Sequence, residues 1–394
     1  MLTAPFPLLP VLFLTALFFL NFTARVILAP LLPVVETELA IGHGTAGALF
    51  LFIQIGYATG LMASGFLSAA LTPRRTIVVS SLGVGAGLLL MAHSGSLLGI
   101  RLSLIVVGAA AGLYLPAGIV SMTGQVEARH WGKALAIHEA APSLGFVAAP
   151  LVAELVLGVL SWRGALVVLG AAALLLGIAY ARWGQRGIAA SEPPRLETMG
   201  RLLIAPEAWM MGLFFTVGIG ASMGLYAVMP LFLVGEVGMA RPAANSLVGA
   251  SRLLSSLMIF PAGLLVDRVG PRRALALSQV IIGGLTLLLG LVADPALTPL
   301  VVLGQSASAV LFFPAGFALI STVFPLPLRS LGVSLAVTMG SLLGAGGLPW
   351  AIGSLAETAS FGLAFVLMGL AVLASPLLLR LSPRKDRPAE AIAP

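Results

Sequence analysis

Apolar residues in this chain occur in long runs, and each run is close to the length of a helix that crosses a membrane. A helix needs about 20 predominantly apolar residues to span the hydrocarbon core of a bilayer. Because lipid offers no hydrogen-bond partners to backbone groups, we expect every such run to be helical. The runs cover residues 8–35, 45–70, 76–93, 97–121, 134–157, 162–182, 208–234, 243–266, 274–293, 297–322, 330–354 and 359–380.

One polar segment divides these runs into two equal sets. The stretch "RWGQRGIAASEPPRLETMGR", beginning at Arg182, carries both signs of charge and two adjacent prolines, which is typical of a linker. We therefore expect an N-terminal six-helix bundle over 1–182, a cytoplasmic linker over 183–205, a C-terminal six-helix bundle over 206–381 and a short cytoplasmic tail over 382–394.

The two halves repeat one another in sequence. "GFLSAALTPRR" begins at Gly65 and "GLLVDRVGPRR" at Gly263, 198 residues later; "LPAG" at Leu115 and "FPAG" at Phe313 have the same offset. Because each half holds an even number of spans, the repeats run in the same direction through the membrane. The predicted fold is an all-α membrane protein with twelve transmembrane helices in two pseudo-symmetric six-helix bundles.

Composition supports a lipid environment and excludes several classes of protein. Hydrophobic residues make up 59% of the chain and charged residues 9%, whereas soluble domains carry about 25% charged residues. The chain has no cysteine, and its four histidines show no metal-ligand spacing. It also lacks a nucleotide-binding loop and the residues for a catalytic triad. We expect no catalytic residue, no metal and no cofactor, and therefore not an enzyme.

The basic residues indicate how the chain is oriented. Most of the 21 lysines and arginines fall in loops that share one side of the membrane if both termini are cytoplasmic, and several acidic residues fall on the opposite side. This predicts a multi-pass protein of the plasma membrane, the inner membrane in a bacterium. The high isoelectric point then follows from topology, and no nucleic-acid partner is implied.

With these features the chain resembles the major facilitator superfamily of secondary transporters, and within it members that carry organic anions such as carboxylates. The resemblance covers nearly the whole length. It rests on the family's loop motif, present in the second half as "GLLVDRVGPRR" from Gly263, on "GFVAAP" at 145–150 and on Trp162 with Arg163. In the first half Ala69 and Ala70 replace the acidic and basic residues of that motif. The resemblance implies passage of a substrate between two rocking bundles, as parallel repeats also suggest. It implies a cytoplasmic gate formed by Gly263, Asp267, Arg268, Arg272 and Arg74; simple topogenic charge is the alternative.

Two arginines lie within predicted spans, where a charge is costly and therefore a candidate for function. Arg25 is in the first span and Arg252 is about ten residues into the eighth. The guanidinium group suits carboxylate, nitrate, sulfonate or phosphate, so both are predicted to bind an anion. The alternative is that they snorkel or cap helix ends. The polar neighbours predicted to complete the substrate site are Asn21, Gln54, Tyr114 and Tyr226; for Tyr57, a further candidate, packing is the favoured explanation.

A proton-coupling group is predicted in the fifth span, where "ALAIHEAAPSLG" contains His138 and Glu139. A partly desolvated carboxyl group near other charges can exchange a proton around neutral pH. The alternative is structural: Glu139 could pair with a cytoplasmic arginine while His138 binds backbone carbonyls.

These features predict a secondary transporter that moves a small organic anion, a carboxylate above all, by alternating access coupled to protons. The expected partners are the anion, protons and the lipid bilayer, and the chain could act as a monomer. Transport of an inorganic anion such as nitrate or cyanate, efflux of hydrophobic or cationic drugs, and a sensor or scaffold without transport are the alternatives.

Overall fold

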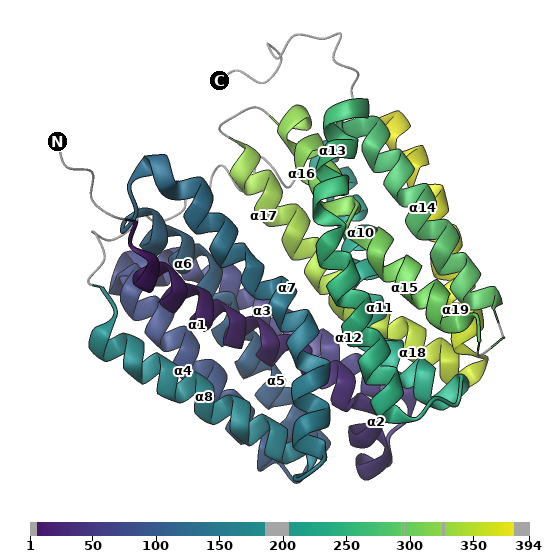
Figure 1. The fold of residues 1–394 in the computed structure, drawn as a ribbon, viewed down its shortest axis with the longest axis horizontal. Coiled ribbons are helices and arrows are strands. Elements are labelled where there is room, and N and C mark those ends of the chain that lie inside the picture. The colour runs from purple at the N-terminus through teal and green to yellow at the C-terminus, as the bar shows by residue number, and fades with distance from the viewer. Residues whose placement is uncertain (1–5, 186–204, 293, 295, 325–327, 382–394) are drawn as a thin grey trace. The chain divides into compact units, whose positions relative to one another are not determined.

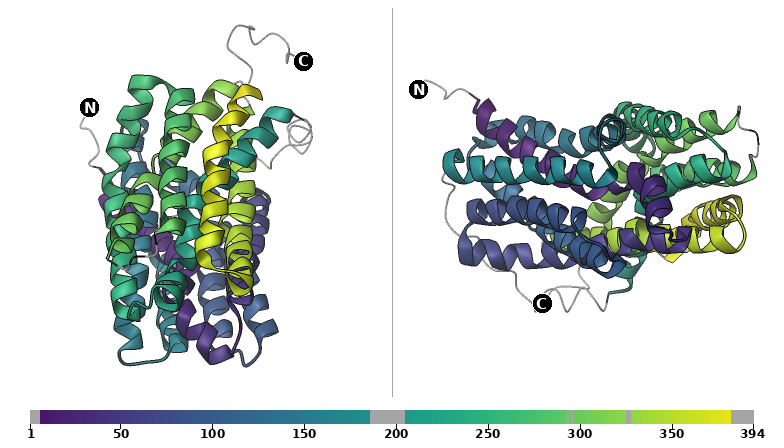
Figure 2. Two further views of the ribbon diagram at one scale, coloured as in Figure 1. Left: turned by 90° about the vertical axis from the view of Figure 1, so that its right-hand side faces the viewer. Right: turned by 90° about the horizontal axis from the view of Figure 1, so that it is seen from below.

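The computed structural model describes residues 6–185, 205–292, 294, 296–324 and 328–381, which fall into two compact units. The first unit comprises Met1–Ile41 and Leu49–Pro194, and the second comprises Gly42–Ala48 and Arg195–Pro394. The described part of the chain is built from helices, and no strand occurs in it (Figures 1 and 2). Most of the predicted linker, over 183–205, and the predicted tail, over 382–394, lie outside the described residues.

The helices of the first unit account for the first six predicted spans. They are α1 (Leu8–Val26), α2 (Leu28–Leu39), α3 (His43–Leu71), α4 (Pro73–Ala92), α5 (Leu97–Gly112), α6 (Tyr114–Thr123), η1 (Ala128–His130), α7 (Trp131–Leu157) and α8 (Trp162–Trp183). The opening turns of α3 group with the second unit.

The second unit has a similar order of elements, with three π-helical turns. They are α10 (Pro206–Ile219), η2 (Gly220–Gly224), α11 (Leu225–Leu231), η3 (Phe232–Glu236), α12 (Arg241–Leu257), α13 (Ile259–Val269), α14 (Pro271–Leu291), α15 (Thr298–Ala309), α16 (Phe312–Val323), α17 (Arg329–Met339), η5 (Gly340–Gly347), α18 (Leu348–Thr358), α19 (Phe361–Ala374) and η6 (Ser375–Leu381). The π-helical turns are η2, η3 and η5.

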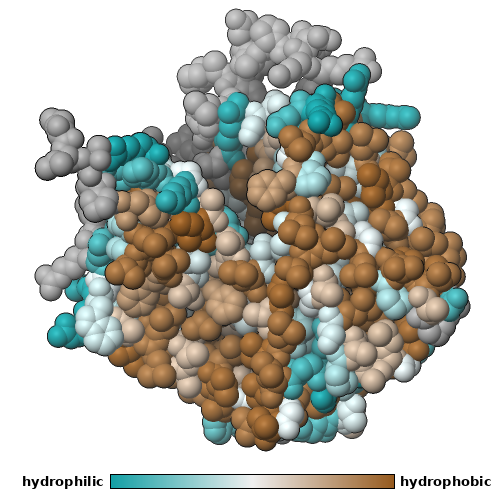
Figure 3. Space-filling view, viewed as in Figure 1, coloured by the Kyte–Doolittle hydropathy of each residue, from teal (hydrophilic) through white to brown (hydrophobic). Residues whose placement is uncertain are grey.

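Twelve continuous helical stretches in the described residues are long and apolar enough to cross a membrane, as the hydropathy pattern predicted. Brown, apolar side chains cover most of the face shown in Figure 3, and teal, polar ones gather near the ends of the helices. Large apolar residues such as Leu155, Leu175 and Phe260 are exposed by 74%, 68% and 80%. Such surfaces are stable in contact with lipid and would associate in water.

Proline explains where the long spans divide into two helices. A proline within a helix clashes with the carbonyl group four residues earlier and cannot donate a hydrogen bond. In three spans the first helix ends at that earlier position: α1 ends four residues before Pro30, α5 four before Pro116, and α12 four before Pro261. The interruptions are therefore local consequences of the sequence.

Contacts inside the two units repeat at the offset of 198 residues that relates their sequences. Arg74, at the start of α4, donates a hydrogen bond of 2.6 Å to the Ala181 carbonyl near the end of α8. Arg272, at the start of α14, donates to the Leu379 carbonyl in η6. A basic residue thus satisfies a carbonyl at the end of the sixth span in each unit, where such groups lack helical partners.

Glycine allows α3 and α5 to approach closely. Gly56 and Gly60 on α3 face α5, and Gly108 and Gly112 on α5 face α3; a Cβ atom at any of these four would overlap the backbone of the opposite helix. Paired small residues four positions apart are a common way for membrane helices to pack. This packing fixes the part of α3 that carries Gln54 and Tyr57.

Candidate functional site

Arg25 is a buried cation at the end of α1. Its side chain is 6% exposed, and its Nη2 atom donates a hydrogen bond of 3.4 Å to Oε1 of Gln54. The guanidinium carbon lies 3.5 Å from the centroid of the Tyr57 ring and 5.7 Å from that of Phe22. Among the described residues its Nε atom has no hydrogen-bond partner and no carboxylate pairs with it. The ring faces offset part of the cost of burial, and the free donor can bind an acceptor.

Arg252 is the corresponding cation of the second unit. It lies in α12 and is 5% exposed; its Nη2 atom donates to the Ser222 carbonyl at 2.7 Å and Nη1 to the Ser222 hydroxyl at 3.4 Å. The guanidinium carbon lies 4.8 Å from the centroid of the Tyr226 ring. Ser222 belongs to η2, a π-helical turn, a geometry found often at functional sites.

The two cations occupy related places but come from different helices of their units. Gln54 and Arg252 are equivalent by the 198-residue offset. In the first unit the arginine is on the first span and its polar acceptor on the second; in the second unit the arginine is on the eighth span and its acceptor on the seventh. Each unit therefore holds a guanidinium group between its first two spans, stacked on a tyrosine.

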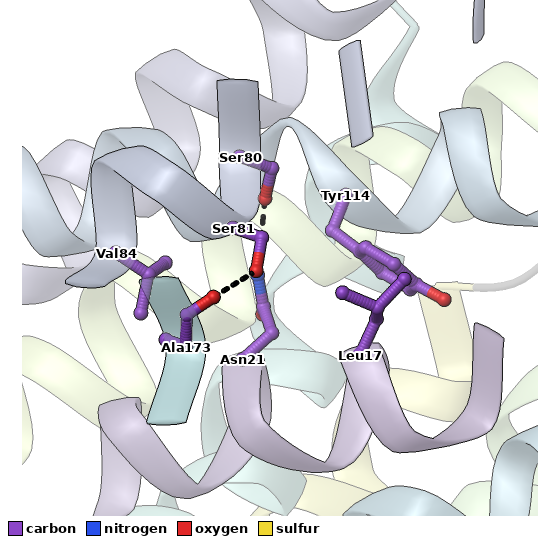
Figure 4. Close-up of a pocket in the computed structure, with 7 residues that line it drawn as sticks. All are labelled: Leu17, Asn21, Ser80, Ser81, Val84, Tyr114 and Ala173. Carbon is purple, nitrogen blue, oxygen red and sulfur yellow. Dashed lines mark hydrogen bonds between the residues drawn. The ribbon is translucent and has the colours of Figure 1, made fainter. Parts of the chain in front are cut away.

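Asn21 bonds within the first unit, apart from Arg25. Its amide donates to the Ser80 hydroxyl at 3.2 Å and to the Ala111 carbonyl at 3.3 Å, which ties α1 to α4 and α5. Figure 4 shows Asn21 and Ser80 among the residues that line a small void, together with Tyr114. The void has no room for a water molecule, so it is a packing gap and not a ligand cavity.

Tyr114 joins the predicted proton-coupling residues. Its hydroxyl donates to the Leu14 carbonyl at 2.6 Å and lies 3.2 Å from Nε2 of His138. Nδ1 of His138 lies 3.1 Å from Oε1 of Glu139. His138 is fully buried, whereas the Glu139 side chain is 53% exposed. The structure thus arranges a carboxyl, an imidazole and a phenol in a hydrogen-bonded row.

The predicted gate residues lie at the end of the second span of each unit or just after it. Gly263, Asp267 and Arg268 are on α13, and Asp267 and Arg268 are exposed. Arg74 and Arg272 bind carbonyl groups of their own units, as described above. The gate stays a prediction, and these two arginines have a structural role besides it.

The sequence analysis did not identify two glutamates, Glu38 and Glu236, that bind helix starts at the ends opposite the predicted gate residues. Glu38 accepts a hydrogen bond of 2.8 Å from the indole Nε1 of Trp162 and forms an ion pair with Arg163. Glu236, 198 residues after Glu38, accepts from the backbone amides of Phe361 at 2.7 Å and Gly362 at 3.2 Å. Each carboxylate holds the first turn of the sixth span in its unit. The recurrence at the repeat offset was the available signal.

Ser222 and Tyr57 were also missing from the predicted site. Ser222 has no distinguishing pattern in the sequence, because its main contribution is a backbone carbonyl. The sequence favoured packing as the role of Tyr57, whereas in the structure its ring lies under the guanidinium group of Arg25. In the described parts of the chain, no group of three or more histidine and acidic side chains is arranged to hold a metal ion.

Comparison with known proteins agrees with this architecture. The family model described as Major Facilitator Superfamily matches residues 14–240 and 210–394. Over 165 residues the chain is 25% identical to a Cupriavidus necator protein named probable sulfoacetate transporter SauU. That match covers 42% of this chain and 38% of the relative, so the chain matches well under half of that protein's length.

Solved structures of transporters share the fold at low sequence identity. A D-xylose–proton symporter has a TM-score of 0.77 and 14% identity, with 95% of this chain and 97% of that chain covered. A POT family transporter in complex with 5-aminolevulinic acid has a TM-score of 0.79 and 12% identity, with 97% of each chain covered. A bacterial homologue of the lysosomal transporter Spinster has a TM-score of 0.78 and 15% identity, with 96% of each covered. With twelve spans, a twofold repeat and a family match along nearly its whole length, the chain belongs to the major facilitator superfamily of transporters.

Proposed function

We propose that this transporter moves a small organic anion by alternating access and that Arg25 and Arg252 bind the anion. The observation that carries the proposal is Arg25: it is buried, no described carboxylate neutralises it, and one of its donors has no partner. A buried cation without a counter-ion is destabilising. An anionic substrate would supply the missing charge while it is bound.

The similarity to a probable sulfoacetate transporter supports an organic anion, although it spans a minority of both chains. Arginine can bind carboxylate or sulfonate oxygens through two parallel N–H donors, which lysine cannot do. Efflux of cationic drugs is less compatible with the site, since Arg25 and Arg252 would repel such substrates. Inorganic anions such as nitrate remain the second candidate, because the same donors would suit them.

We also propose that transport is coupled to protons through His138 and Glu139 and that both chain ends face the cytoplasm. The hydrogen-bonded row from Glu139 to Tyr114 supports the first part, because it offers groups that can accept and release a proton. The concentration of basic residues in the loops on one side supports the second.

Uptake into liposomes that contain the purified protein tests the substrate. The labelled probes are acetate, sulfoacetate, nitrate and a lipophilic cationic drug, each measured with and without an inward proton gradient. We expect uptake of an organic anion that the gradient accelerates, and a loss of at least tenfold in Arg25→Lys and Arg252→Lys. Drug transport without anion transport would overturn the proposal, whereas nitrate uptake alone would select the second candidate.

Arg101 provides the matched control. It is another arginine of the first unit, in α5, with its guanidinium carbon 5.3 Å from the centroid of Phe52. Its Nε atom, like that of Arg25, has no hydrogen-bond partner among the described residues, but Arg101 is less buried and is not part of the proposed site, so Arg101→Lys should keep uptake within about twofold of the unchanged protein. An equal loss in Arg101→Lys and Arg25→Lys would mean that Arg25 is not distinguished from another arginine of the same unit, and the binding assignment would fail.

A further inference from the structure

The rings around His138 fix its orientation. Phe18 of α1 lies parallel to the imidazole, with centroids 4.6 Å apart and planes at 14°, and parallel to Tyr114, at 5.2 Å and 13°. The imidazole itself is fully buried. With its plane held by this stack, each ring nitrogen has one neighbour: Nε2 faces the Tyr114 hydroxyl and Nδ1 faces the Glu139 carboxyl.

The Tyr114 hydroxyl determines which ring nitrogen of His138 carries a hydrogen atom. A carbonyl oxygen can only accept, so the 2.6 Å bond between Tyr114 and the Leu14 carbonyl uses the single hydroxyl hydrogen. The phenol oxygen can then only accept from His138. Nε2 must therefore carry a hydrogen and donate it, because two lone pairs facing each other in a buried site would be unfavourable.

That assignment leaves two arrangements at Nδ1. If Nδ1 also carries a hydrogen, His138 is an imidazolium ion that donates to an ionised Glu139. If Nδ1 is bare, Glu139 must be a neutral acid that donates to it. Either way, the contact contains one proton more than a neutral imidazole beside a carboxylate.

We propose that the contact between His138 and Glu139 holds one exchangeable proton and that Tyr114 is the positioning residue that confines it there. Because the Tyr114 hydroxyl donates to Leu14, it can only accept from Nε2 of His138, which keeps a hydrogen on Nε2. Nδ1 is then the only basic nitrogen of the ring. The proton reaches that nitrogen from the half-exposed Glu139. When the proton leaves, bare Nδ1 and the carboxylate repel each other, and Glu139 separates from His138. This gives Tyr114 a role inside the first unit in place of the predicted contact with substrate.

Other ionisable groups on the neighbouring elements have partners of their own. From α1, Phe18 stacks on His138 and the Leu14 carbonyl accepts from Tyr114, and neither group titrates. Among the remaining groups, the Tyr180 hydroxyl of α8 lies 3.3 Å from the Ser121 hydroxyl, Arg129 pairs with Glu127 at 2.9 Å, the Lys133 ammonium lies 4.5 Å from the centroid of Phe6, and His130 packs edge-on against the same ring. Glu139 therefore has His138 as its partner for the proton.

The number of protons held by His138 and Glu139 can be measured on the purified full chain without any substrate. Nitrogen NMR of histidine-labelled protein at neutral pH reports the hydrogens on each ring nitrogen, with His138→Gln identifying the signal among the four histidines. Infrared spectroscopy reports whether a carboxylic acid band disappears in Glu139→Gln. We expect a protonated Nε2 together with either an imidazolium ring or a neutral Glu139. A bare Nε2, or a neutral ring beside an ionised Glu139, would overturn the proposal.

Tyr114→Phe tests the positioning role, and Tyr180→Phe is the matched control in the same unit. Without the phenol, His138 can place its hydrogen on Nδ1 and donate to an ionised carboxylate, so the extra proton is no longer required. We expect a shift toward the Nδ1–H form in Tyr114→Phe and none in Tyr180→Phe. An unchanged His138 signal in Tyr114→Phe would contradict the positioning role.

The use of this proton in transport rests on the proposed function, and a separate measurement addresses it. In liposomes, Glu139→Gln should keep anion exchange but lose acceleration by a proton gradient. If the proton is found by spectroscopy and no anion is transported, the proposed function fails and the proton assignment stands. If anions are transported and the spectroscopic count is wrong, the assignment fails alone.

Discussion

Arg25 lies directly over the ring of Tyr57, with the guanidinium carbon 3.5 Å from the ring centroid. The second unit repeats the pairing between Arg252 and Tyr226, at 4.8 Å. The arginine and the tyrosine exchange helices between the units. Both units therefore contain the same arginine–tyrosine contact, although equivalent positions hold different residues. A ring face stabilises a buried cation without neutralising it, so the guanidinium group keeps its attraction for an anion.

Replacing the ring under Arg25 should destabilise the protein, whereas removing only its hydroxyl should not. A desolvated cation–π contact is worth about 2 kcal/mol, so Tyr57→Leu should lower the melting temperature of the detergent-solubilised protein by several degrees. Tyr57→Phe keeps the ring and should stay close to the unchanged protein. In an Arg25→Gln background, Tyr57→Leu should cost clearly less. An equal cost in both backgrounds would show that Tyr57 contributes through packing and not through the cation.

The contacts of Glu38 with Trp162 and Arg163 predict different effects for Glu38→Ala and Glu38→Gln. Glu38→Ala removes the acceptor of the fully buried Trp162, and a buried unpaired donor costs about 1–3 kcal/mol. Glu38→Gln keeps an oxygen for the indole and loses only the charge that pairs with the partly exposed Arg163, so its effect should be under about 1 kcal/mol. Thermal unfolding in detergent measures both. A larger loss in Glu38→Gln than in Glu38→Ala would mean that the ion pair, and not the indole bond, holds the helix end.

Thr72 should be replaceable by glycine with a gain in stability. Its backbone has φ 102° and ψ 149°, a region that residues with a side chain rarely adopt and that costs about 1–3 kcal/mol. Its counterpart 198 residues later is Gly270, at φ 79° and ψ 158°. Thr72→Gly relieves the strain but loses the hydrogen bond that the Arg75 amide donates to the Thr72 hydroxyl, and it adds freedom to the unfolded chain. We expect a net gain of about 1 kcal/mol.

Gly270→Thr is the reciprocal test and should lower the melting temperature, because it introduces the strain that Thr72 carries. If Thr72→Gly destabilises the protein while Gly270→Thr leaves it unchanged, the strain argument is wrong. Comparing the two variants also separates backbone strain from the side-chain bond, since a glycine at 270 makes no such bond in the unchanged protein.

The hydropathy pattern predicted the spans well because the physical requirement is local: lipid demands a helix of about 20 apolar residues wherever the run occurs. The repeat offset likewise needed no tertiary information. Arg25 and Arg252 could be selected because charge is rare in such runs. Gln54 was chosen through the offset, and the structure brings it to Arg25.

Contacts that depend on backbone atoms or on the direction of a side chain were beyond the sequence. Asn21, one turn before Arg25, points instead to Ser80 and Ala111, because α4 and α5 supply nearer acceptors. The Tyr114 hydroxyl donates to the Leu14 carbonyl, and Arg252 donates to the Ser222 carbonyl. Any residue type can supply a carbonyl group, so such partners leave no mark in the sequence.

The proposed topology can be tested with two cysteines in a chain that has none. Gly95, between α4 and α5, should face outward, and Gly132, at the start of α7, should face the cytoplasm. Both are exposed, and a Cβ at either position meets nothing within 4 Å, so Gly95→Cys and Gly132→Cys should fold normally. A membrane-impermeant maleimide should label Gly95→Cys in intact cells and Gly132→Cys only after permeabilisation. The unchanged protein is the blank. The reverse pattern would place the termini outside and remove the support that the basic loops give to the present orientation.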